Sequence, residues 1–204
     1  MLVKNYIYKG PVMEWYVRIK VKMERSYKIF DELIPERGQI TDIGCGYGTL
    51  GYMLAMLSPD RQVLGIDYDE DKAEVARYGY LHKENTVFVY ADALEYPLPE
   101  SDVFVLNDML HYMDSRKQES LLKRCVRNLR DDGLIIVRDG DSRDKQRQRL
   151  TKLSEIFSTR IFGFNKTKEE LCFTSAEKLY EIAETCNMTV ELSLIHISEP
   201  TRLD

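Results

Sequence analysis

The middle of the chain alternates between two patterns of apolar and polar residues. Five short apolar runs have the length and composition of buried β-strands. These runs span residues 39–43, 62–66, 86–90, 102–106 and 134–138. Three segments between the runs carry apolar residues at helical spacing, and they span residues 49–57, 71–81 and 115–129. Strands separated by helices predict a parallel sheet covered on both faces, because each parallel connection needs a long crossover.

The N-terminal part of the chain also has helical spacing. Residues 11–33 carry this pattern and begin with Pro11, which suits a first helical turn. Trp15, Ile19 and Met23 lie on one face of the helix that results. We therefore predict helical structure ahead of the sheet.

The last third of the chain departs from the alternation. Residues 143–157 predict a helix inserted above the sheet, and residues 161–165 predict an apolar loop. Either Thr174 or Ser175 can cap the helix that follows. Residues 189–195 predict a sixth strand.

Composition narrows the class of protein. With 204 residues and 44% hydrophobic residues, the chain can build one α/β domain with a modest cap. A formal net charge of -5 argues against a nucleic-acid partner. The four cysteines form no CxxC pair and His is scarce, which indicates neither a disulfide framework nor a metal site. No apolar leader or transmembrane segment is visible, so we expect a cytoplasmic protein.

Positive charge is concentrated in two stretches. Residues 1–30 hold seven Lys or Arg against two acids, and residues 143–168 hold eight against two. Such stretches are ordinarily solvated helix faces. The alternative is a basic rim that binds an anionic partner.

The first chemical signal is a glycine loop directly after the first predicted strand, Asp42-Ile43-Gly44-Cys45-Gly46-Tyr47-Gly48, and it is a weak signal when taken alone. Glycines let the backbone turn tightly and approach a ligand, and the helix that follows offers unpaired N–H groups. Dinucleotide-binding enzymes use a similar loop, but their pattern has Gly or Ala at the position of Thr49. Asp42 favours a ligand with a cationic end, because a pyrophosphate gains nothing from a carboxylate.

Acidic residues also follow the second and third predicted strands, and ligands of parallel sheets bind where the carboxyl ends of strands meet. At Asp67-Tyr68 the carboxylate can accept hydrogen bonds from ribose hydroxyls, and the ring can lie against adenine. The alternatives are a helix-capping acid and a surface aromatic residue. At Asp92-Ala93 the carboxylate and the next N–H can meet an adenine, and the alternative is the cap of a short helix.

The fourth predicted strand ends at Asn107-Asp108, with His111-Tyr112 close behind. His111 is the first candidate for a general base, because histidine titrates near neutrality. Tyr112 and Asp108 are alternative bases. The competing interpretation is that His111 is a structural, hydrogen-bonded residue.

These motifs together resemble the class I S-adenosylmethionine (SAM)-dependent methyltransferases over residues 39–139, about half of the chain. The turn at residues 131–133 is also similar to the family's entry into its fifth strand. The resemblance implies a Rossmann-like, doubly wound α/β fold with a mostly parallel sheet, and it implies SAM as the cofactor. The implied contacts, from methionine to adenine, are Asp42, Gly44, Cys45, Gly46, Gly48, Asp67, Tyr68, Asp92 and Ala93, with the Asn107 backbone facing the sulfonium.

The resemblance also implies a division of the chain into five parts. They are an N-terminal helical cap (1–38), a SAM-binding core (39–140), an inserted helix and loop over the site (141–173), the last helix and strand six (174–195), and a non-native tail (196–204).

A narrower similarity concerns the acceptor. Residues 6–15, 106–112 and 138–141 resemble methyltransferase domains of bacterial aryl-polyene or flexirubin-type pigment clusters, some of which are fused behind an exporter and an acyltransferase. This resemblance implies that the acceptor is an aromatic or polyene acyl group, with an acyl carrier protein as its carrier. Carrier proteins are acidic, so the two basic stretches would have a partner.

We expect methyl transfer to a small-molecule or carrier-tethered acceptor. One alternative is a non-catalytic SAM-binding or interaction domain. Another is an NAD or nucleotide-sugar enzyme, against which Asp42 and Thr49 argue. Four aromatic residues near the N-terminus form either a lid over the acceptor or part of the core: Tyr6, Tyr8, Trp15 and Tyr16.

The C-terminus departs from the family pattern. Methyltransferases of this class end with a sixth strand and an antiparallel seventh. Only nine residues follow the sixth predicted strand here, and residues 198–204 form a polar segment with Pro200 in it, which does not predict a strand. Residues 193–202 resemble a translated sequencing-adapter tail. We therefore expect the native end of the sheet to be missing.

Overall fold

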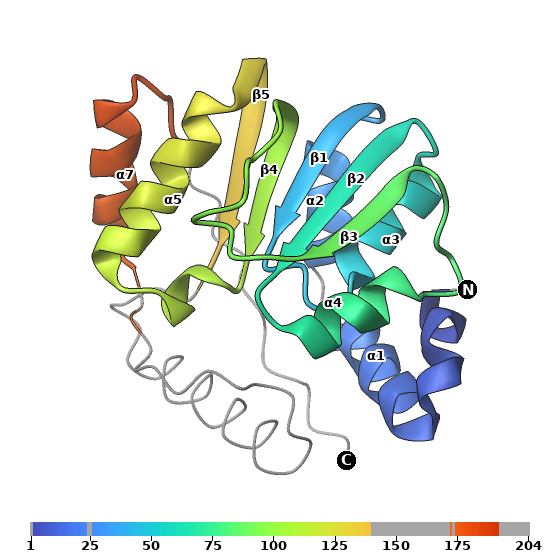
Figure 1. The fold of residues 1–204 in the computed structure, drawn as a ribbon. Helices are drawn as coiled ribbons and strands as arrows, with labels where there is room; N and C mark the ends of the chain where they lie inside the picture. The colour runs from blue at the N-terminus through green and yellow to red at the C-terminus, as the bar shows by residue number, and fades with distance from the viewer. Residues whose placement is uncertain (1, 24–25, 140–171, 173, 192–204) are drawn as a thin grey trace, which may run out of the picture.

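A computed structural model describes residues 2–23, 26–139, 172 and 174–191. Five parallel strands form one sheet in the order β3-β2-β1-β4-β5 (Figure 1). The strands are β1 Gly38–Ile43, β2 Arg61–Asp67, β3 Thr86–Tyr90, β4 Ser101–Asn107 and β5 Leu129–Arg138. The helices are η1 Leu2–Lys9, α1 Pro11–Met23, α2 Ser26–Leu33, α3 Thr49–Leu57, α4 Glu70–Arg77, η2 Leu110–Tyr112, α5 Ser115–Arg127 and α7 Ala176–Thr185. This is the Rossmann-like α/β fold that the sequence predicts.

The direction of the winding reverses at β1. The chain first builds outward through β2 and β3, and then returns to place β4 on the other side of β1. Ile43 at the end of β1 is therefore paired with Ile66 of β2 and with Leu106 of β4. The loops that follow β1 and β4 run in different directions from this point, so a crevice forms between them. Open α/β sheets bind ligands in such a crevice.

Alternate residues of the strands build two separate cores. Ile43 and Leu106 pack with α5 and α7 on one face of the sheet. Ile40 and Val105 pack with α2 and α3 on the other face. A strand points successive side chains to opposite faces, so a strand covered on both sides must be apolar throughout. The near-continuous apolar runs of the sequence have this origin.

Arg61 fastens α2 to the sheet. Its guanidinium lies at the start of β2 with 1% of the residue exposed. It donates to the carboxylate of Asp31 at 2.6 Å and to the backbone oxygens of Ile34, Pro35 and Leu54 at 2.8, 2.9 and 3.3 Å. The planar fork of arginine can satisfy several acceptors at once, which a lysine could not. The end of α2 is therefore held on the amino-terminal side of the sheet.

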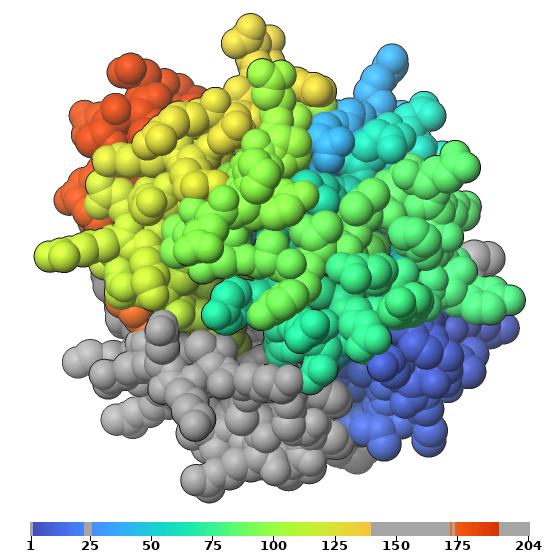
Figure 2. Space-filling model, in the orientation of Figure 1, coloured from blue at the N-terminus to red at the C-terminus, as the bar shows by residue number. Residues whose placement is uncertain are grey.

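Most element bounds agree with the predicted ones, and α3 and β3 agree at both ends. The helix predicted for residues 71–81 instead ends at Arg77. The reason is a long-range contact, because Asn5 of η1 accepts from the backbone N–H groups of Tyr80 and Leu81. In the space-filling view, the N-terminal residues in blue lie directly against this part of the chain (Figure 2).

The N-terminal segment predicted to be helical is helical, and the structure divides it. The structure has two helices there, α1 and α2, and a 3-10 helix, η1, before them. The buried face of α1 carries Met13 and Val17, whereas 55% of Trp15 is exposed. Met13 and Val17 are four residues apart and so share a helix face, which here packs against Tyr6 and Val75.

The fifth strand begins earlier than predicted. β5 starts at Leu129 and includes the predicted turn residues 131–133. Asp132 has a φ of 60°, and the pairing with β4 shifts register between Ser101 and Val103. From the Ser101–Leu129 pair to the Val103–Leu134 pair, β4 advances by two residues and β5 by five, so β5 contains three extra residues at this point. The turn signal therefore marked a bulge within the strand.

The C-terminal elements are described only in part. Ser175 caps α7 by accepting from the backbone N–H of Lys178 at 3.3 Å, as predicted. Residues 189–191, the described part of the predicted sixth strand, have no regular secondary structure. The predicted helix 143–157, the loop 161–165, residues 192–195 and the tail 196–204 lie outside the described residues. Among the described helices, none is both long enough and apolar enough to cross a bilayer.

Replacing Arg61 with Met should lower the free energy of unfolding by about 3 kcal/mol, because the buried backbone oxygens that it binds lose their donor. Chemical denaturation at pH 7 measures this value. Lys28→Met is the control, since Lys28 is an exposed cation of α2 that pairs with Glu32. The control should change stability by less than about 0.5 kcal/mol. An equal effect of the two substitutions would show that Arg61 does not fasten α2.

Candidate functional site

The glycine loop turns sharply between β1 and α3. Gly44 and Gly48 have φ values of 74° and 72°, in the left-handed region that glycine tolerates best. A Cβ on Gly44 would lie 2.6 Å from the Cβ of Met109, and one on Gly48 would lie 2.7 Å from the ring of Phe88. Both positions thus require glycine for backbone angle and for space. The sequence pattern correctly marked a loop that packs closely on the sheet.

Asp67 holds the glycine loop from the end of β2. Its Oδ2 accepts from the backbone N–H of Gly46 at 2.6 Å, and its Oδ1 accepts from that of Asp69 at 2.8 Å. Burial raises the pKa of the Asp67 carboxyl, and these two N–H groups oppose the shift by stabilising the charged form. The two acids of the neighbouring strand ends, Asp67 and Asp42, therefore both adjoin the same loop.

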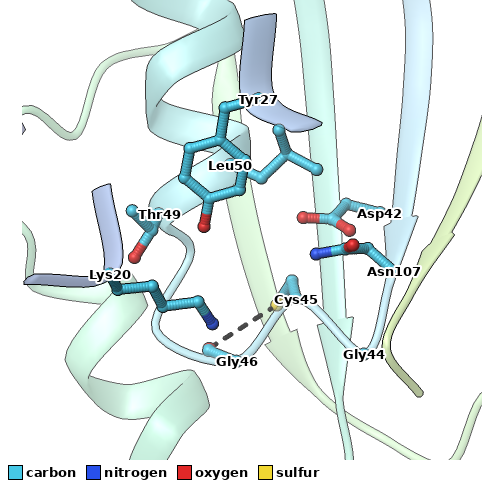
Figure 3. A pocket seen from close by; sticks show the side chains of 9 residues that line it. All are labelled: Lys20, Tyr27, Asp42, Gly44, Cys45, Gly46, Thr49, Leu50 and Asn107. Atoms are coloured by element: carbon cyan, nitrogen blue, oxygen red, sulfur yellow. Dashed lines mark hydrogen bonds between the residues drawn. The ribbon is translucent and has the colours of Figure 1, made fainter. Parts of the chain in front are cut away.

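A pocket opens between this loop, the end of β4 and the N-terminal helices (Figure 3). Five predicted site residues line it: Asp42, Gly44, Cys45, Gly46 and Asn107. Four others complete the lining: Lys20, Tyr27, Thr49 and Leu50. Lys20 belongs to α1 and Tyr27 to α2, so helices that precede the sheet in sequence form one wall of the pocket.

Asp42 is the unusual residue of this pocket. The residue is 2% exposed, and its Oδ2 has no hydrogen-bond partner among the described residues. Buried carboxylate oxygens are almost always paired, because an unpaired one has lost water without compensation. Burial, reinforced by the nearby charge of Asp67 and opposed by Lys20, raises the pKa of Asp42 to about 7. Asp42 therefore presents an unmet acceptor to a donor that enters the pocket.

The other predicted cofactor contacts lie outside the lining of this pocket. Tyr68 is 72% exposed, and its ring centroid lies 6.3 Å from that of Tyr90. Asp92 accepts from the backbone N–H of Leu94 at 2.8 Å, so its carboxylate caps the turn after β3. Ala93 is buried in the core on the α5 face. Gly48 stays in the loop as the residue that precedes α3.

Asp108 and Asn107 are both engaged by Arg138 from the neighbouring strand β5. Asp108 has a φ of 53°, and its backbone N–H donates to the Arg138 oxygen at 2.7 Å. The Arg138 guanidinium donates to the Asn107 side-chain oxygen at 3.1 Å and pairs with the Asp108 carboxylate. The Asp108 carboxylate is therefore occupied by an ion pair with Arg138.

His111 is paired with a residue that the sequence did not single out as catalytic. Its Nδ1 lies 2.5 Å from Oδ1 of Asp139, whose Oδ2 accepts from the His111 backbone N–H at 3.0 Å. Both side chains are 3% exposed. The ring of Tyr112 lies 4.3 Å from that of His111, centroid to centroid. His111 and Asp139 follow β4 and β5, so their pairing depends on those strands being neighbours in the sheet.

The N-terminal aromatic residues have separate positions. Tyr6 is fully buried and donates to the Tyr47 backbone oxygen at 2.8 Å, within the glycine loop. Tyr8 donates to the Val75 backbone oxygen at 2.8 Å. The ring of Tyr16 meets that of Tyr47 edge-on at 5.8 Å. Tyr6 thus belongs to the core, whereas Tyr8 and Trp15 are 49% and 55% exposed, so core packing accounts for only part of this group.

Lys20, Tyr27 and Asp139 have no local signal that would have identified them. Lys20 stands among other basic residues of the N-terminal stretch, and Tyr27 has ordinary helical spacing. The glycine loop and the strand ends could be found because their chemistry is contained in a few consecutive residues. No group of three or more His, Cys, Asp or Glu residues in the described part of the chain could hold a metal ion.

Comparison with known proteins agrees with this geometry. The family described as "Methyltransferase domain" matches residues 40–133. The chain is 27% identical over 120 residues to carboxy-S-adenosyl-L-methionine synthase of Campylobacter jejuni subsp. doylei, which covers 56% of this chain and 49% of that protein. It is 31% identical over 137 residues to trans-aconitate 2-methyltransferase of Deinococcus radiodurans, which covers 66% of this chain and 51% of that protein.

A solved structure with the same fold is that of human N-acetylserotonin methyltransferase in complex with SAM. It has a TM-score of 0.59 and 18% identity, and the match covers 88% of this chain and 51% of that one. The chain spans about half the length of the curated relatives it matches. The chain contains a class I SAM-dependent methyltransferase domain.

The cofactor of this methyltransferase domain is SAM, and the residues present fit it. SAM carries an ammonium group at its methionine end, and the unpaired oxygen of Asp42 is a hydrogen-bond acceptor in a buried pocket. A Cβ added to Gly46 would meet nothing within 4 Å, so the loop is open at this point. A pocket with a buried, unmet acceptor beside an open backbone loop suits a ligand that brings its own cation.

The raised pKa of Asp42 makes a prediction about stability. Its folded pKa of about 7 lies above the ordinary value near 3.9, so the folded protein binds this proton more tightly than the unfolded chain does. The contribution of this proton to the free energy of unfolding is complete below pH 4. It is lost as the pH rises to 7, by up to about 1.4 kcal/mol per pH unit. Asp42→Asn should therefore become progressively more stable relative to the wild type over this range.

Urea denaturation of the ligand-free protein at several pH values from 4 to 7.5 measures the difference between wild type and variant. Asp60→Asn is the control, because it removes a carboxylate that is exposed. A difference between wild type and Asp42→Asn that does not change with pH would contradict the prediction.

Proposed function

We propose that this domain transfers the methyl group of SAM to a small-molecule or carrier-tethered acceptor. The observation that carries the proposal is the unpaired, buried oxygen of Asp42 beside the glycine loop, because it meets the need of a cationic methionine end. When bound, SAM supplies an electrophilic methyl group on a sulfonium centre. The residues of the chain bind and align the two reactants, and such alignment can lower a barrier by roughly 7–11 kcal/mol.

Asp42 binds the methionine ammonium, and the backbone of Gly44, Cys45, Gly46 and Gly48 borders the methionine and ribose. Asp67 binds the ribose hydroxyls. An ionised carboxylate has about four acceptor sites, and Asp67 uses two of them in the bonds to Gly46 and Asp69. Its remaining capacity supports this role.

Tyr68, Asp92 and Ala93 bind the adenine, and the Asn107 backbone faces the sulfonium. The exposure of the Tyr68 ring supports the first assignment, since the ring is available for stacking. The carboxylate of Asp92 accepts one described hydrogen bond, from Leu94, and so keeps acceptor capacity for an amino group. Residues 1–38 act as a cap on the core, and the pocket lining by Lys20 supports this division of the chain.

His111 acts as the general base for an oxygen or nitrogen acceptor, and Asp139 orients it. The 2.5 Å contact between Nδ1 of His111 and Oδ1 of Asp139 supports this role, because it fits a proton on Nδ1 that is donated to the Asp139 oxygen. The basic lone pair is then on Nε2, which takes the proton of the acceptor as the methyl group is transferred. Tyr112 and Asp108 are weaker candidates, and the ion pair with Arg138 counts against Asp108.

Two measurements test the function as a whole. Isothermal titration calorimetry with SAM should show binding of one equivalent, and radiolabelled SAM should then transfer label to one of a panel of aromatic acids and phenols. No binding at high micromolar concentration would contradict the proposal. Binding without turnover on any acceptor would favour the alternative of a non-catalytic SAM-binding or interaction domain.

Replacing His111 with Asn should lower kcat by about 10²–10⁴-fold, because the base is lost, while the SAM dissociation constant stays within about twofold. Asp139→Asn should lower kcat and shift its pH profile, because the tautomer of His111 is no longer fixed. His82→Asn is the matched control, since His82 is exposed and distant in the chain. Unchanged kcat in His111→Asn would assign His111 a structural role.

In a narrower form of this proposal, the acceptor is an aryl or polyene acyl group on an acyl carrier protein. Its support is the sequence resemblance together with the basic N-terminal stretch, of which Lys22 is exposed on α1. Transfer to a carrier-loaded acyl group should have a higher kcat/KM than transfer to the free acid. The advantage should shrink as salt rises from 0.05 to 0.5 M, about tenfold or more, because salt screens attraction between the basic stretch and an acidic carrier. Equal kcat/KM values at all salt concentrations would contradict a carrier-bound acceptor.

A further inference from the structure

The pocket contains a cation that comes from outside the sheet. Met13, Val17 and Lys20 are spaced by four and three residues, so they share one face of α1. The first two are buried against Tyr6 and Val75, which turns this face of the helix toward the core. Lys20 lies one helical turn beyond Val17 and lines the pocket beside the glycine loop. The packing of α1 thus determines where Lys20 lies.

Lys20 and Asp42 lie on different walls of the same pocket. In Figure 3 the amine of Lys20 points toward Gly46, and the carboxylate of Asp42 points into the pocket from the side of β1. Oδ2 of Asp42 has no hydrogen-bond partner among the described residues, so Lys20 does not bond to it. Their charges still interact, because Lys20 lowers the pKa of Asp42. The pocket therefore offers one positive and one negative group to a ligand.

The methionine end of SAM carries the matching pair of charges, an ammonium and an α-carboxylate on one carbon. Asp42 can meet only the ammonium, since a carboxylate repels a carboxylate. Burial of the SAM α-carboxylate without a cationic partner would cost free energy, and the glycine loop alone provides only neutral N–H donors. A pocket that binds this end well needs a cation, and Lys20 is the basic residue in its lining.

We propose that Lys20 binds the α-carboxylate of the methionine end of SAM, so that α1 and the sheet recognise the amino-acid head together. This inference rests on the proposed function, which supplies SAM as the ligand. With Lys20 in this role, the N-terminal helices are part of the cofactor site, whereas the glycine loop and the acidic residues all lie at the ends of strands.

Decarboxylated SAM tests the proposal, because it keeps the sulfonium, the amine and the adenosine but lacks the α-carboxylate. Calorimetry should show that wild-type protein binds SAM about tenfold to hundredfold more tightly than decarboxylated SAM, the range expected for a charge-assisted hydrogen bond. Lys20→Met should weaken SAM binding by a similar factor and leave decarboxylated SAM within about twofold. Lys20→Arg should keep most of the preference for SAM, because it keeps the charge.

Lys22→Met is the matched control, because Lys22 lies on the same helix with its side chain exposed. It should bind both ligands like the wild type. Equal binding of the two ligands by the wild type would overturn the proposal without any variant. An equal loss for both ligands in Lys20→Met would also overturn it, since it would show a structural role. Failure of the wild type to bind either ligand would instead overturn the proposed function itself.

Discussion

The packing of Phe88 beneath the glycine loop is the contact on which the site depends. Phe88 is 2% exposed, and its ring fills the space beside Gly48, Gly51 and Gly65. A Cβ on Gly48 would lie 2.7 Å from this ring, and one on Gly65 would lie 2.4 Å from it. Close packing of this kind tolerates no added methyl group without displacement of the backbone. The loop is thereby seated on β2 and β3. Only from this position can Gly46 donate to Asp67 and Asp42 face the pocket.

The site joins a local part to a distant part. The local part is the loop between β1 and α3, and the distant part is the wall formed by α1 and α2. Tyr6 connects the two by donating to the loop at Tyr47, and Arg61 fastens the end of α2 to the sheet. Because the wall carries Lys20, a change in the packing of the N-terminal helices would alter the charge of the pocket. Ligand recognition and stability of the N-terminal region are therefore coupled.

The periodicity of the sequence was sufficient for the five strands, for α3 and α5, and for the parallel sheet, because these signals are repeated over many residues. It failed where a tertiary contact decides the boundary. Asn5 binds the chain beyond α4 and ends that helix early, and a bulge lets β5 begin at Leu129. The spacing also did not show which face of α1 is buried, because the exposed Trp15 has the same helical spacing as a buried residue.

By itself the sequence determined the α/β class, the order of its elements and the half of the site contained in consecutive residues. The glycines act through backbone geometry, and Asp42 acts through a carboxylate placed at the end of a strand, and the chain encodes both locally. Only the tertiary structure decided that Lys20 enters the pocket and that His111 pairs with Asp139. These residues are brought together by helix packing and strand order, and such contacts depend on many weak interactions that no short segment contains.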